Sequence, residues 1–384
     1  MFAKRTNWNL APNALAETLA KHRAAGKPLI DLTVSNPTEC GFTYESEVIL
    51  EALRNAAALR YEPNARGLKV AREAVVRYYA DRGDRVAVDD MILTTSTSEA
   101  YSWVFRLLCD AGSEVLVPAP SYPLLGFLAD IQDVNLVRYP LFYDHGWHID
   151  MHELERAITA RTRAVVVVHP NNPTGNYCRS NEMQRLAAIC AERGLAIIAD
   201  EVFLDFALDG VRRASFVEST EALTFTMSGI SKICGLPQMK VAWLVTSGPA
   251  VLKSEALARL EVIADTYLSM SAPVQLALGA LLGTRHSFQA QLLNRVRANL
   301  AELDCQVAAR ALGERLVTEA GWYAMLHVLT TSQPGESDVA EWLGKGQLAH
   351  PGHFYDSSSD RQLVISLIPR NAEFAQGASV FARI

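Results

Sequence analysis

The sequence predicts an α/β protein with two domains: a three-layer α/β/α large domain around a mostly parallel sheet, and a smaller α+β domain. Three observations support this. The 384 residues are 49% hydrophobic and 20% charged, an ordinary globular composition with enough length for two cores. Between residues 91 and 245, short apolar runs alternate with helical patterns, and after Pro249 long helical patterns dominate. We expect residues 36–282 to form the large domain, and residues 1–35 with 283–384 the small one.

The first ninety residues indicate helices and loops around one short strand. Helical periodicity stops near Gly26, and a Ser-Asn-Pro turn closes the strand, since these residues favour helix ends and turns. The expected elements are a helix over 10–25, a strand over Ile30–Val34, helices over Ser46–Leu59 and Val70–Arg82, and a loop from Tyr61 to Gly67.

The middle of the chain alternates strands with helices. Its apolar runs are continuous, which is typical of strands that are covered on both faces. In such sheets ligands bind at the carboxyl ends of the strands, so the loops that follow these runs should converge on one site. The expected strands are Ile92–Thr95, Glu114–Pro118, Val134–Tyr139, Ala164–His169, Leu195–Asp200, Val202–Phe206, Leu223–Met227 and Val241–Val245, with helices through Leu108, from Pro123, after Asp150 and from Asn181.

The last third reads as the smaller lobe. The N-terminal helix is expected to pack with it. The expected elements are two long helices over about 250–283 and 286–313, strands at Tyr323–Leu329 and Leu363–Leu367, and a helix near 337–347.

Composition excludes several classes of protein. A net charge of −6 argues against binding to nucleic acid, and no apolar run reaches the length that a membrane span needs. The six cysteines are scattered without metal-site spacing, so they indicate free thiols in a reducing compartment and no metal. The first 27 residues lack the apolar stretch of a signal peptide. We expect a cytoplasmic protein without membrane or nucleic-acid partners.

The stretch Ser228–Pro237 surrounds Lys232 with small residues and ends in a Gly-Leu-Pro turn. The buried run Val241–Val245 follows, so Lys232 is expected on a loop beside buried structure. An amine there loses its proton more easily and can attack a carbonyl to form a Schiff base. Taken alone, the stretch is more typical of a surface lysine before a turn.

Two other loops bring hydroxyls and an aromatic ring to strand ends. Thr94–Ala100 joins a strand to a helix, where hydroxyls and free amides either bind a phosphate or cap the helix. Pro118–Pro123 is a rigid loop that presents Tyr122, either to stack on a flat heterocycle or to pack in the core.

Two further loops supply an amide and a carboxylate. His169–Gly175 is fixed by two prolines and a glycine, and its Asn172 can hydrogen-bond a ring oxygen, whereas His169 is taken as structural. Asp200 ends a buried strand and needs a partner, either a protonated pyridine nitrogen or a basic side chain. Glu201 suits the plainer structural role.

These stretches, in this order, resemble the pyridoxal-phosphate-dependent aminotransferases of class I/II, fold type I, over nearly the whole chain. The resemblance implies pyridoxal 5′-phosphate as cofactor, with Lys232 forming the Schiff base and Asp200 pairing with the ring nitrogen. It also implies a homodimer in which Tyr61 reaches the neighbouring subunit's phosphate. The other implied contacts are Asn172 to the ring hydroxyl, Tyr122 to the ring, Ser96 and Thr97 to the phosphate, and Asn36, Asn172 and Tyr122 to the substrate.

The chain departs from the family's pattern around the phosphate. Phe203 replaces the usual ring-binding tyrosine. Gly229 replaces a phosphate-binding serine, which leaves Ser228 and Ser231 as candidates, and Lys240 replaces the phosphate-binding arginine, keeping the charge without the bidentate fork. Further departures are Ser96, Gln238 and Ala242 where glycines are usual.

Another departure lies in the C-terminal strand. Val364 stands where the family places the arginine that grips the substrate carboxylate. Arg361 and Arg370 flank this position out of register, so another residue binds the carboxylate or the substrate is unusual.

The leading hypothesis is an aminotransferase (EC 2.6.1.-) that moves an amino group from an amino acid or related amine to a keto acid. A lyase, decarboxylase or synthase using the same cofactor is the alternative, because a fold does not decide among these reactions. A ligand-binding transcription regulator is disfavoured, since the residues before the first strand are too few for a DNA-binding domain and the chain is acidic.

Overall fold

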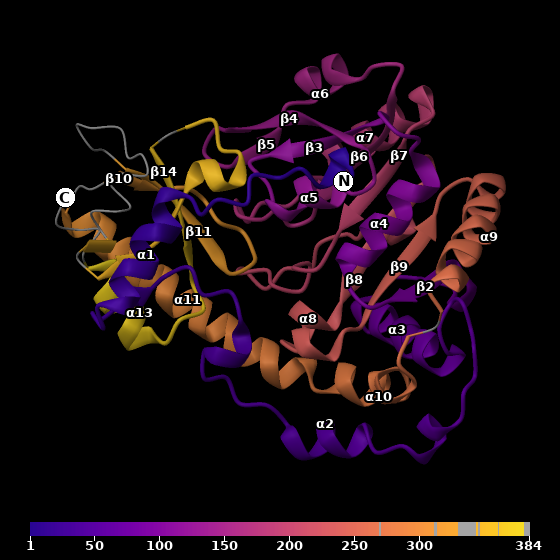
Figure 1. Ribbon diagram of the computed structural model, residues 1–384, viewed down its shortest axis with the longest axis horizontal. Coiled ribbons are helices and arrows are strands. Elements are labelled where there is room, and N and C mark those ends of the chain that lie inside the picture. The colour runs from indigo at the N-terminus through magenta and orange to yellow at the C-terminus, as the bar shows by residue number, and fades with distance from the viewer. Residues whose placement is uncertain (269, 311–312, 329–342, 345, 360, 380–384) are drawn as a thin grey trace.

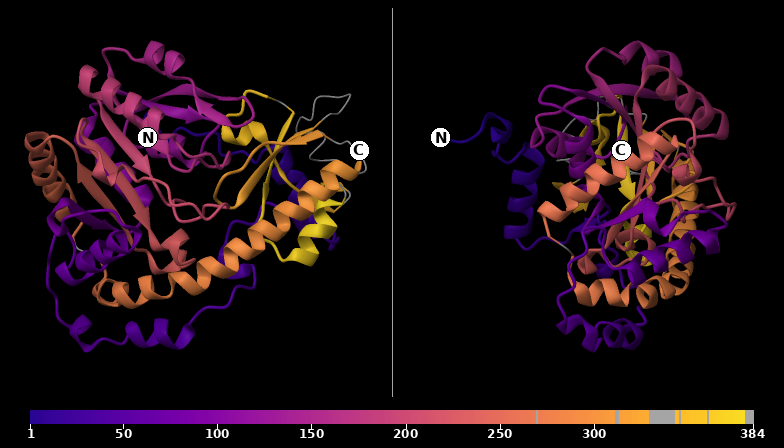
Figure 2. Two further views of the ribbon diagram at one scale, coloured as in Figure 1. Left: turned by 180° about the vertical axis from the view of Figure 1, so that it is seen from behind. Right: turned by 90° about the vertical axis from the view of Figure 1, so that its right-hand side faces the viewer.

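The computed structural model describes residues 1–268, 270–310, 313–328, 343–344, 346–359 and 361–379. An eight-stranded sheet and a four-stranded sheet form the centres of two lobes, which the long helix α11 (Arg285–Arg310) connects (Figure 1). The view from behind shows the same two lobes with α11 spanning them (Figure 2). The predicted domain boundaries at residues 36 and 282 stay a prediction.

The eight-stranded sheet is mostly parallel, as the sequence predicted. Its strand order is β2-β9-β8-β7-β6-β3-β4-β5, with β8, β7, β6, β3 and β4 parallel to one another. Only β9 and β5 turn against their neighbours. The strands are β2 (Met91–Thr94), β3 (Glu114–Ala119), β4 (Asn135–Tyr143), β5 (Trp147–Ile149), β6 (Thr162–Val168), β7 (Ala196–Asp200), β8 (Thr224–Gly229) and β9 (Ala242–Ser247).

Helices cover both faces of this sheet, because the side chains of each strand alternate between two apolar cores. On β7, Ile198 joins the core under α4, α5 and α9, whereas Ile197 joins the opposite core with α6 and α7. Helices α3 and α10 extend that opposite layer over β9 and β2. The helices are α2 (Ser46–Ala52), α3 (Lys69–Arg82), α4 (Thr97–Leu108), α5 (Leu124–Asp130), α6 (Met151–Ala157), α7 (Ser180–Arg193), α8 (Ile230–Ile233), α9 (Ala250–Thr266) and α10 (Ala272–Gly283).

The smaller lobe packs helices against the four-stranded sheet, whose order is β10-β11-β14-β13. Leu15 of α1 shares a core with Leu363 of β14 and Phe374 of α13, which confirms that the N-terminal helix packs with this lobe. The elements are α1 (Ala14–Ala24), β10 (Gly313–Arg315), β11 (Tyr323–Val328), β13 (His350–Pro351), β14 (Gln362–Ser366) and α13 (Asn371–Ala378), with a separate pair of strands β1 (Ile30–Asp31) and β12 (Gln347–Leu348).

Several local predictions were wrong. The predicted strand Val202–Phe206 is a series of turns, because the Asp200 side chain accepts the Val202 amide and the Leu204 amide bonds back to Glu201. The predicted helix over 250–283 is split between α9 and α10. The predicted helix near 337–347 lies largely outside the described residues. Short 3-10 helices occupy Lys4–Thr6, Pro37–Glu39, Ala56–Leu59, Val88–Asp90, Phe216–Glu218, Pro237–Met239 and Gly352–Tyr355.

Candidate active site

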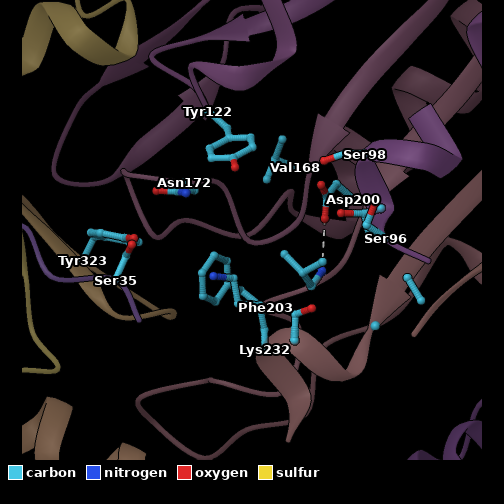
Figure 3. A pocket seen from close by; sticks show the side chains of 15 residues that line it. Ser35, Ser96, Ser98, Tyr122, Val168, Asn172, Asp200, Phe203, Lys232 and Tyr323 are labelled. Carbon is cyan, nitrogen blue, oxygen red and sulfur yellow. Dashed lines mark hydrogen bonds between the residues drawn. The ribbon is translucent and has the colours of Figure 1, made fainter. Parts of the chain in front are cut away.

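A cavity of about 240 Å³ lies at the carboxyl ends of the central strands, where the sequence predicted that the loops converge. Strand ends, the start of α4 and α8 surround it, together with residues of the smaller lobe (Figure 3). No helix within the described ranges has both the length and the apolar character to cross a membrane. The cavity is lined by Ser35, Ser96, Thr97, Ser98, Tyr122, Val168, Asn172, Asp200, Val202, Phe203, Gly229, Ser231, Lys232, Ala242 and Tyr323.

Lys232 lies in α8, a single helical turn directly after β8, rather than on the loop that the sequence predicted. Its Nζ lies 4.7 Å from the ring centroid of Trp322 and 5.6 Å from that of Phe203. Burial among these rings lowers the pKa of Lys232 to about 8, with Asp200 opposing the shift. The amine is therefore neutral, and so nucleophilic, at a lower pH than an exposed lysine.

Asp200 is the last residue of β7 and is 7% exposed. Its Oδ1 accepts the Val202 N–H at 3.2 Å, and its Oδ2 accepts the Tyr101 hydroxyl at 3.2 Å. Burial raises the pKa of Asp200 to about 6, against the effect of these two hydrogen bonds and of Lys232. A buried carboxylate beside a cavity can bind a protonated nitrogen there.

Glu201 points to the opposite face of the sheet, where its hydrogen bonds stay within the fold, but the salt bridge that the sequence predicted for it is wrong. Ser215 donates to its Oε2 at 2.6 Å, and the Phe216 N–H donates to its Oε1 at 2.7 Å. Burial raises its pKa to about 7. Its partners are a hydroxyl and an amide, where the sequence suggested a basic side chain.

The start of α4 presents hydroxyl groups at one end of the cavity. Ser96 caps the helix by accepting the Glu99 N–H at 3.1 Å, and Thr97 and Ser98 line the cavity beside it. Ser231 faces the same cavity from α8. A helix N-terminus that presents free amides and hydroxyls favours a phosphate group.

Gly229 lines the cavity beside this end. A Cβ at Gly229 would lie 2.8 Å from the Cβ of Ala242, which faces it on β9. The backbone carbonyl oxygen of Val241 lies 2.9 Å from the same Cβ position, so a side chain and the backbone both exclude a serine at position 229. These contacts explain why the chain has glycine there.

Asn172 and Tyr122 occupy another wall of the cavity (Figure 3). The side-chain oxygen of Asn172 is buried without a hydrogen-bond partner, which is unusual in a folded protein and marks a place where a ligand group fits. Tyr122 is 42% exposed, so its ring is open to the cavity. Burial of its hydroxyl and the nearby Asp200 raise its pKa.

Four predicted site residues lie outside the lining of this cavity. Ser228 is buried and donates to the carbonyl of Glu201 at 3.3 Å. Lys240 is exposed, with a left-handed φ of 54°. Asn36 uses its Oδ1 to accept from Thr38, whereas its neighbour Ser35 lines the cavity.

Tyr61 is the fourth of these. It is 75% exposed and lines a separate cavity of about 450 Å³ with Met270 and Pro273.

Sequence reasoning missed Ser35, Tyr323 and Tyr101. Tyr101 follows Thr97 by one helical turn and so shares its side of α4, a spacing that could have suggested it. Ser35 and Tyr323 come from the smaller lobe, nearly three hundred residues apart, and no local pattern brings them together.

The residues present fit pyridoxal 5′-phosphate. An amine of lowered pKa can bind its aldehyde, a buried carboxylate its ring nitrogen, and the hydroxyls with the α4 N-terminus its phosphate. Asn172, with its unpartnered side-chain oxygen, lines the same cavity on the wall beside Tyr122 (Figure 3). The lining thus matches each polar end of this cofactor.

Solved aminotransferases share this fold. An aminotransferase from Escherichia coli superposes with a TM-score of 0.89 at 23% identity, covering 100% of this chain and 97% of its own. Alanine aminotransferase from Pyrococcus furiosus superposes with a TM-score of 0.90 at 21% identity, over the full length of both chains. The α/β architecture is therefore that of the fold type I aminotransferases, as predicted.

The family sequence profile described as "Aminotransferase class I and II" matches residues 27–332, and the chain belongs to this family. The family uses pyridoxal phosphate. Among curated relatives, glutamate-pyruvate aminotransferase AlaA of Escherichia coli K12 is 30% identical over 260 residues, which are 67% of this chain and 64% of that protein. Human tyrosine aminotransferase is 25% identical over 359 residues, 88% of this chain and 79% of its own.

Proposed function

We propose that this protein is a pyridoxal-phosphate-dependent aminotransferase that moves an amino group from an amino acid or related amine to a keto acid. The observation that carries the proposal is the pairing of Lys232, an amine of lowered pKa, with the buried carboxylate of Asp200 in one cavity. The activities for which the relatives are named support amino acids and keto acids as substrates.

Each residue has a separate task in this mechanism. The cofactor, when bound, supplies an aldehyde that exchanges amino groups and a ring that accepts an electron pair. Lys232 would hold the cofactor covalently through its neutral Nζ, and that atom would carry a proton as general base and acid. Asp200 would keep a proton on the ring nitrogen, and Ser96, Thr97 and the α4 N-terminus would hold the phosphate.

The substrate side of the cavity is uncharged. Among the described lining residues only Lys232 and Asp200 carry charge, and both serve the cofactor. Val364 is buried among apolar side chains, so no guanidinium enters from that position of β14. We propose that hydroxyl and amide groups of Ser35, Tyr323 and Asn172 bind the substrate carboxylate.

A second carboxylate on the substrate would lack a cation in this lining. Because an unpaired buried charge is costly, we expect uncharged amino acids to react about tenfold or more faster than glutamate or aspartate. Competing donors in one mixture, quantified as keto products, measure this ratio directly. Faster reaction of the dicarboxylic donors would contradict the uncharged substrate side.

A half-reaction tests the activity itself. The protein is loaded with pyridoxal 5′-phosphate, excess cofactor is removed, and each amino acid is added without a keto acid. We expect loss of the cofactor's visible absorption and one keto acid per site. Release of ammonia or carbon dioxide in that amount, with the cofactor not aminated, would instead indicate a lyase or decarboxylase.

We further propose a cytoplasmic homodimer. Leu59 and Tyr61 are exposed beside the second cavity. A second copy of the chain would cover both residues there, and Tyr61 would reach the phosphate site of that second copy. The six cysteines are all free thiols, which suits a reducing compartment. Sedimentation equilibrium should give twice the chain mass, and Tyr61→Phe should weaken cofactor binding. A monomer that binds the cofactor fully would contradict the assembly.

A further inference from the structure

Tyr101 contacts the carboxylate of Asp200 from outside the lining of the cavity. It lies on α4, one turn after Thr97, and is 2% exposed. Its hydroxyl donates to Asp200 Oδ2 at 3.2 Å, and its ring packs on Phe105 at 5.9 Å between centroids. Tyr101 is absent from the cavity lining, so it reaches a ligand only through Asp200.

Asp200 depends on few partners. Its Oδ1 accepts the Val202 N–H, and its Oδ2 accepts Tyr101. The titratable groups that face it are Tyr101 from α4, Lys232 from α8 and Tyr122 from the loop after β3. Tyr101 therefore supplies the only side-chain hydrogen bond to this carboxylate within the described part of the chain.

The direction of this hydrogen bond is fixed. Burial and the neighbouring Asp200 carboxylate raise the pKa of Tyr101 well above its ordinary value of 10, so the phenol stays protonated and donates. A donor to a carboxylate stabilises the ionised form, and a bond to a charged acceptor is stronger than one between neutral groups. The hydroxyl thus opposes the tendency of burial to protonate Asp200.

We propose that Tyr101 is a positioning residue that keeps Asp200 ionised and turned toward the cavity, ready to pair with a protonated ring nitrogen. The pairing of Asp200 with a ring nitrogen rests on the proposed function. The ionisation of Asp200 concerns only residues of this chain and can be measured without any cofactor. α4 then serves both ends of the ligand, since its first turn presents hydroxyls and its second turn fixes the carboxylate.

The chain offers a matched control for the hydroxyl. Tyr139 is 1% exposed, and its hydroxyl donates to the backbone carbonyl of Val166 at 2.8 Å rather than to a carboxylate. Tyr101→Phe and Tyr139→Phe each remove one buried hydroxyl and the hydrogen bond that it donates. Both should lower Tm, so loss of stability does not distinguish a positioning role, whereas the titration of Asp200 does.

The experiment is a carboxyl-carbon NMR titration of cofactor-free protein with labelled aspartate, in which Asp200 is assigned by the signal that Asp200→Asn removes. We expect Tyr101→Phe to bind the Asp200 proton about threefold to tenfold more tightly than the wild type. Tyr139→Phe should leave this titration unchanged. 3-Fluorotyrosine at position 101, a stronger donor, should shift it in the opposite direction and keeps the test valid if the phenylalanine variant fails to fold.

Binding of pyridoxal 5′-phosphate to the same variants gives a second readout. We expect the affinity of Tyr101→Phe to fall more steeply below pH 7 than that of Tyr139→Phe. An unchanged Asp200 titration in both the phenylalanine and fluorotyrosine proteins would overturn the proposal. A wild type that binds no cofactor would overturn the proposed function and leave the titration result standing.

Discussion

Asp200 and Glu201 are adjacent in sequence, yet they belong to two different regions of the molecule. Asp200 faces the cavity at the end of β7, and its two hydrogen bonds are both 3.2 Å long. Glu201 faces the opposite side of the sheet, and its two donors lie at 2.6 and 2.7 Å. Burial raises the pKa of both side chains, to about 6 and about 7.

The difference in hydrogen bonding distinguishes the proposed functional carboxylate from the structural one, whereas burial is similar for both. Two tight neutral donors satisfy Glu201 within the fold, so it needs nothing from a ligand. The looser bonds of Asp200, beside an open cavity, leave its charge to be compensated by something that binds. Buried carboxylates at strand ends are thus distinguished by how far the protein itself satisfies them.

Removing the amine that faces Asp200 should have the largest effect. Lys232→Ala should lower the half-reaction rate by about 10⁴-fold or more, because both the covalent attachment and the proton transfer are lost. Single-turnover absorption measurements with a reactive amino acid give the rate. Lys69→Ala, an exposed lysine paired with Glu73, is the control and should react normally. Normal turnover by Lys232→Ala would contradict the mechanism.

Asp200→Asn should separate activity from stability. The half-reaction should slow by about a hundredfold or more, because the ring nitrogen loses its proton. The cofactor-free protein should become more stable at pH 7, by up to about 3 kcal/mol, since the variant removes a buried charge.

The sign of this stability change follows from the raised pKa. Folded Asp200 binds its proton up to about pH 6, and unfolded aspartate only up to about pH 4. The fold therefore loses stability as the pH rises from about 4 to 6, and the full loss is present above pH 6. Urea unfolding should show the gain of the variant at pH 7 and none near pH 3. A variant that is less stable than the wild type at pH 7 would contradict the raised pKa of Asp200.

The pH dependence of the rate of cofactor binding should reflect the titration of both Lys232 and Asp200. Neutral Lys232 increases as pH rises through about 8, so the capture rate should rise about tenfold between pH 7 and the plateau above pH 8. It should fall again below about pH 6 as Asp200 becomes protonated. Stopped-flow absorption measures both limbs. A midpoint near 10.5, the ordinary value for lysine, would contradict the burial of Lys232.

Glu201→Gln should have the smallest effect on activity. Its amide would set an N–H₂ group against one of two donors, Ser215 or the Phe216 N–H, which costs about 1–3 kcal/mol. This loss should show fully near pH 4, whereas at pH 7 removal of a buried charge of raised pKa offsets part of it. In the folded enzyme we expect the half-reaction rate to stay within about threefold of wild type. Urea unfolding and single-turnover kinetics provide the two values, and a hundredfold slower reaction would remove the distinction between the carboxylates.

The sequence predicted the large sheet and the convergence of its loops, because continuous apolar runs and turn residues are local signals. Asn172, Asp200 and Lys232 each follow such a run, and all three line the cavity. The turns over residues 202–206 were not predicted, since the side chain of Asp200 that caps them competes with an apolar pattern that favours a strand.

Contacts between distant segments were also beyond prediction. Tyr323 enters the cavity from β11 and Ser35 from the other end of the chain, so only the packing of the two lobes brings them to Lys232. The close approach of Gly229 to Ala242 likewise depends on the pairing of β8 with β9. Both depend on tertiary arrangement, which leaves no periodic signal in the sequence.

The central claim is that Lys232 is the amine that binds the cofactor beside Asp200, and borohydride reduction tests it most directly. Protein loaded with pyridoxal 5′-phosphate is reduced, digested and mapped by mass spectrometry. The account predicts one phosphopyridoxyl group per chain, located on Lys232 and absent from Lys232→Ala. Modification spread over exposed lysines, with Lys232 unmodified, would contradict it.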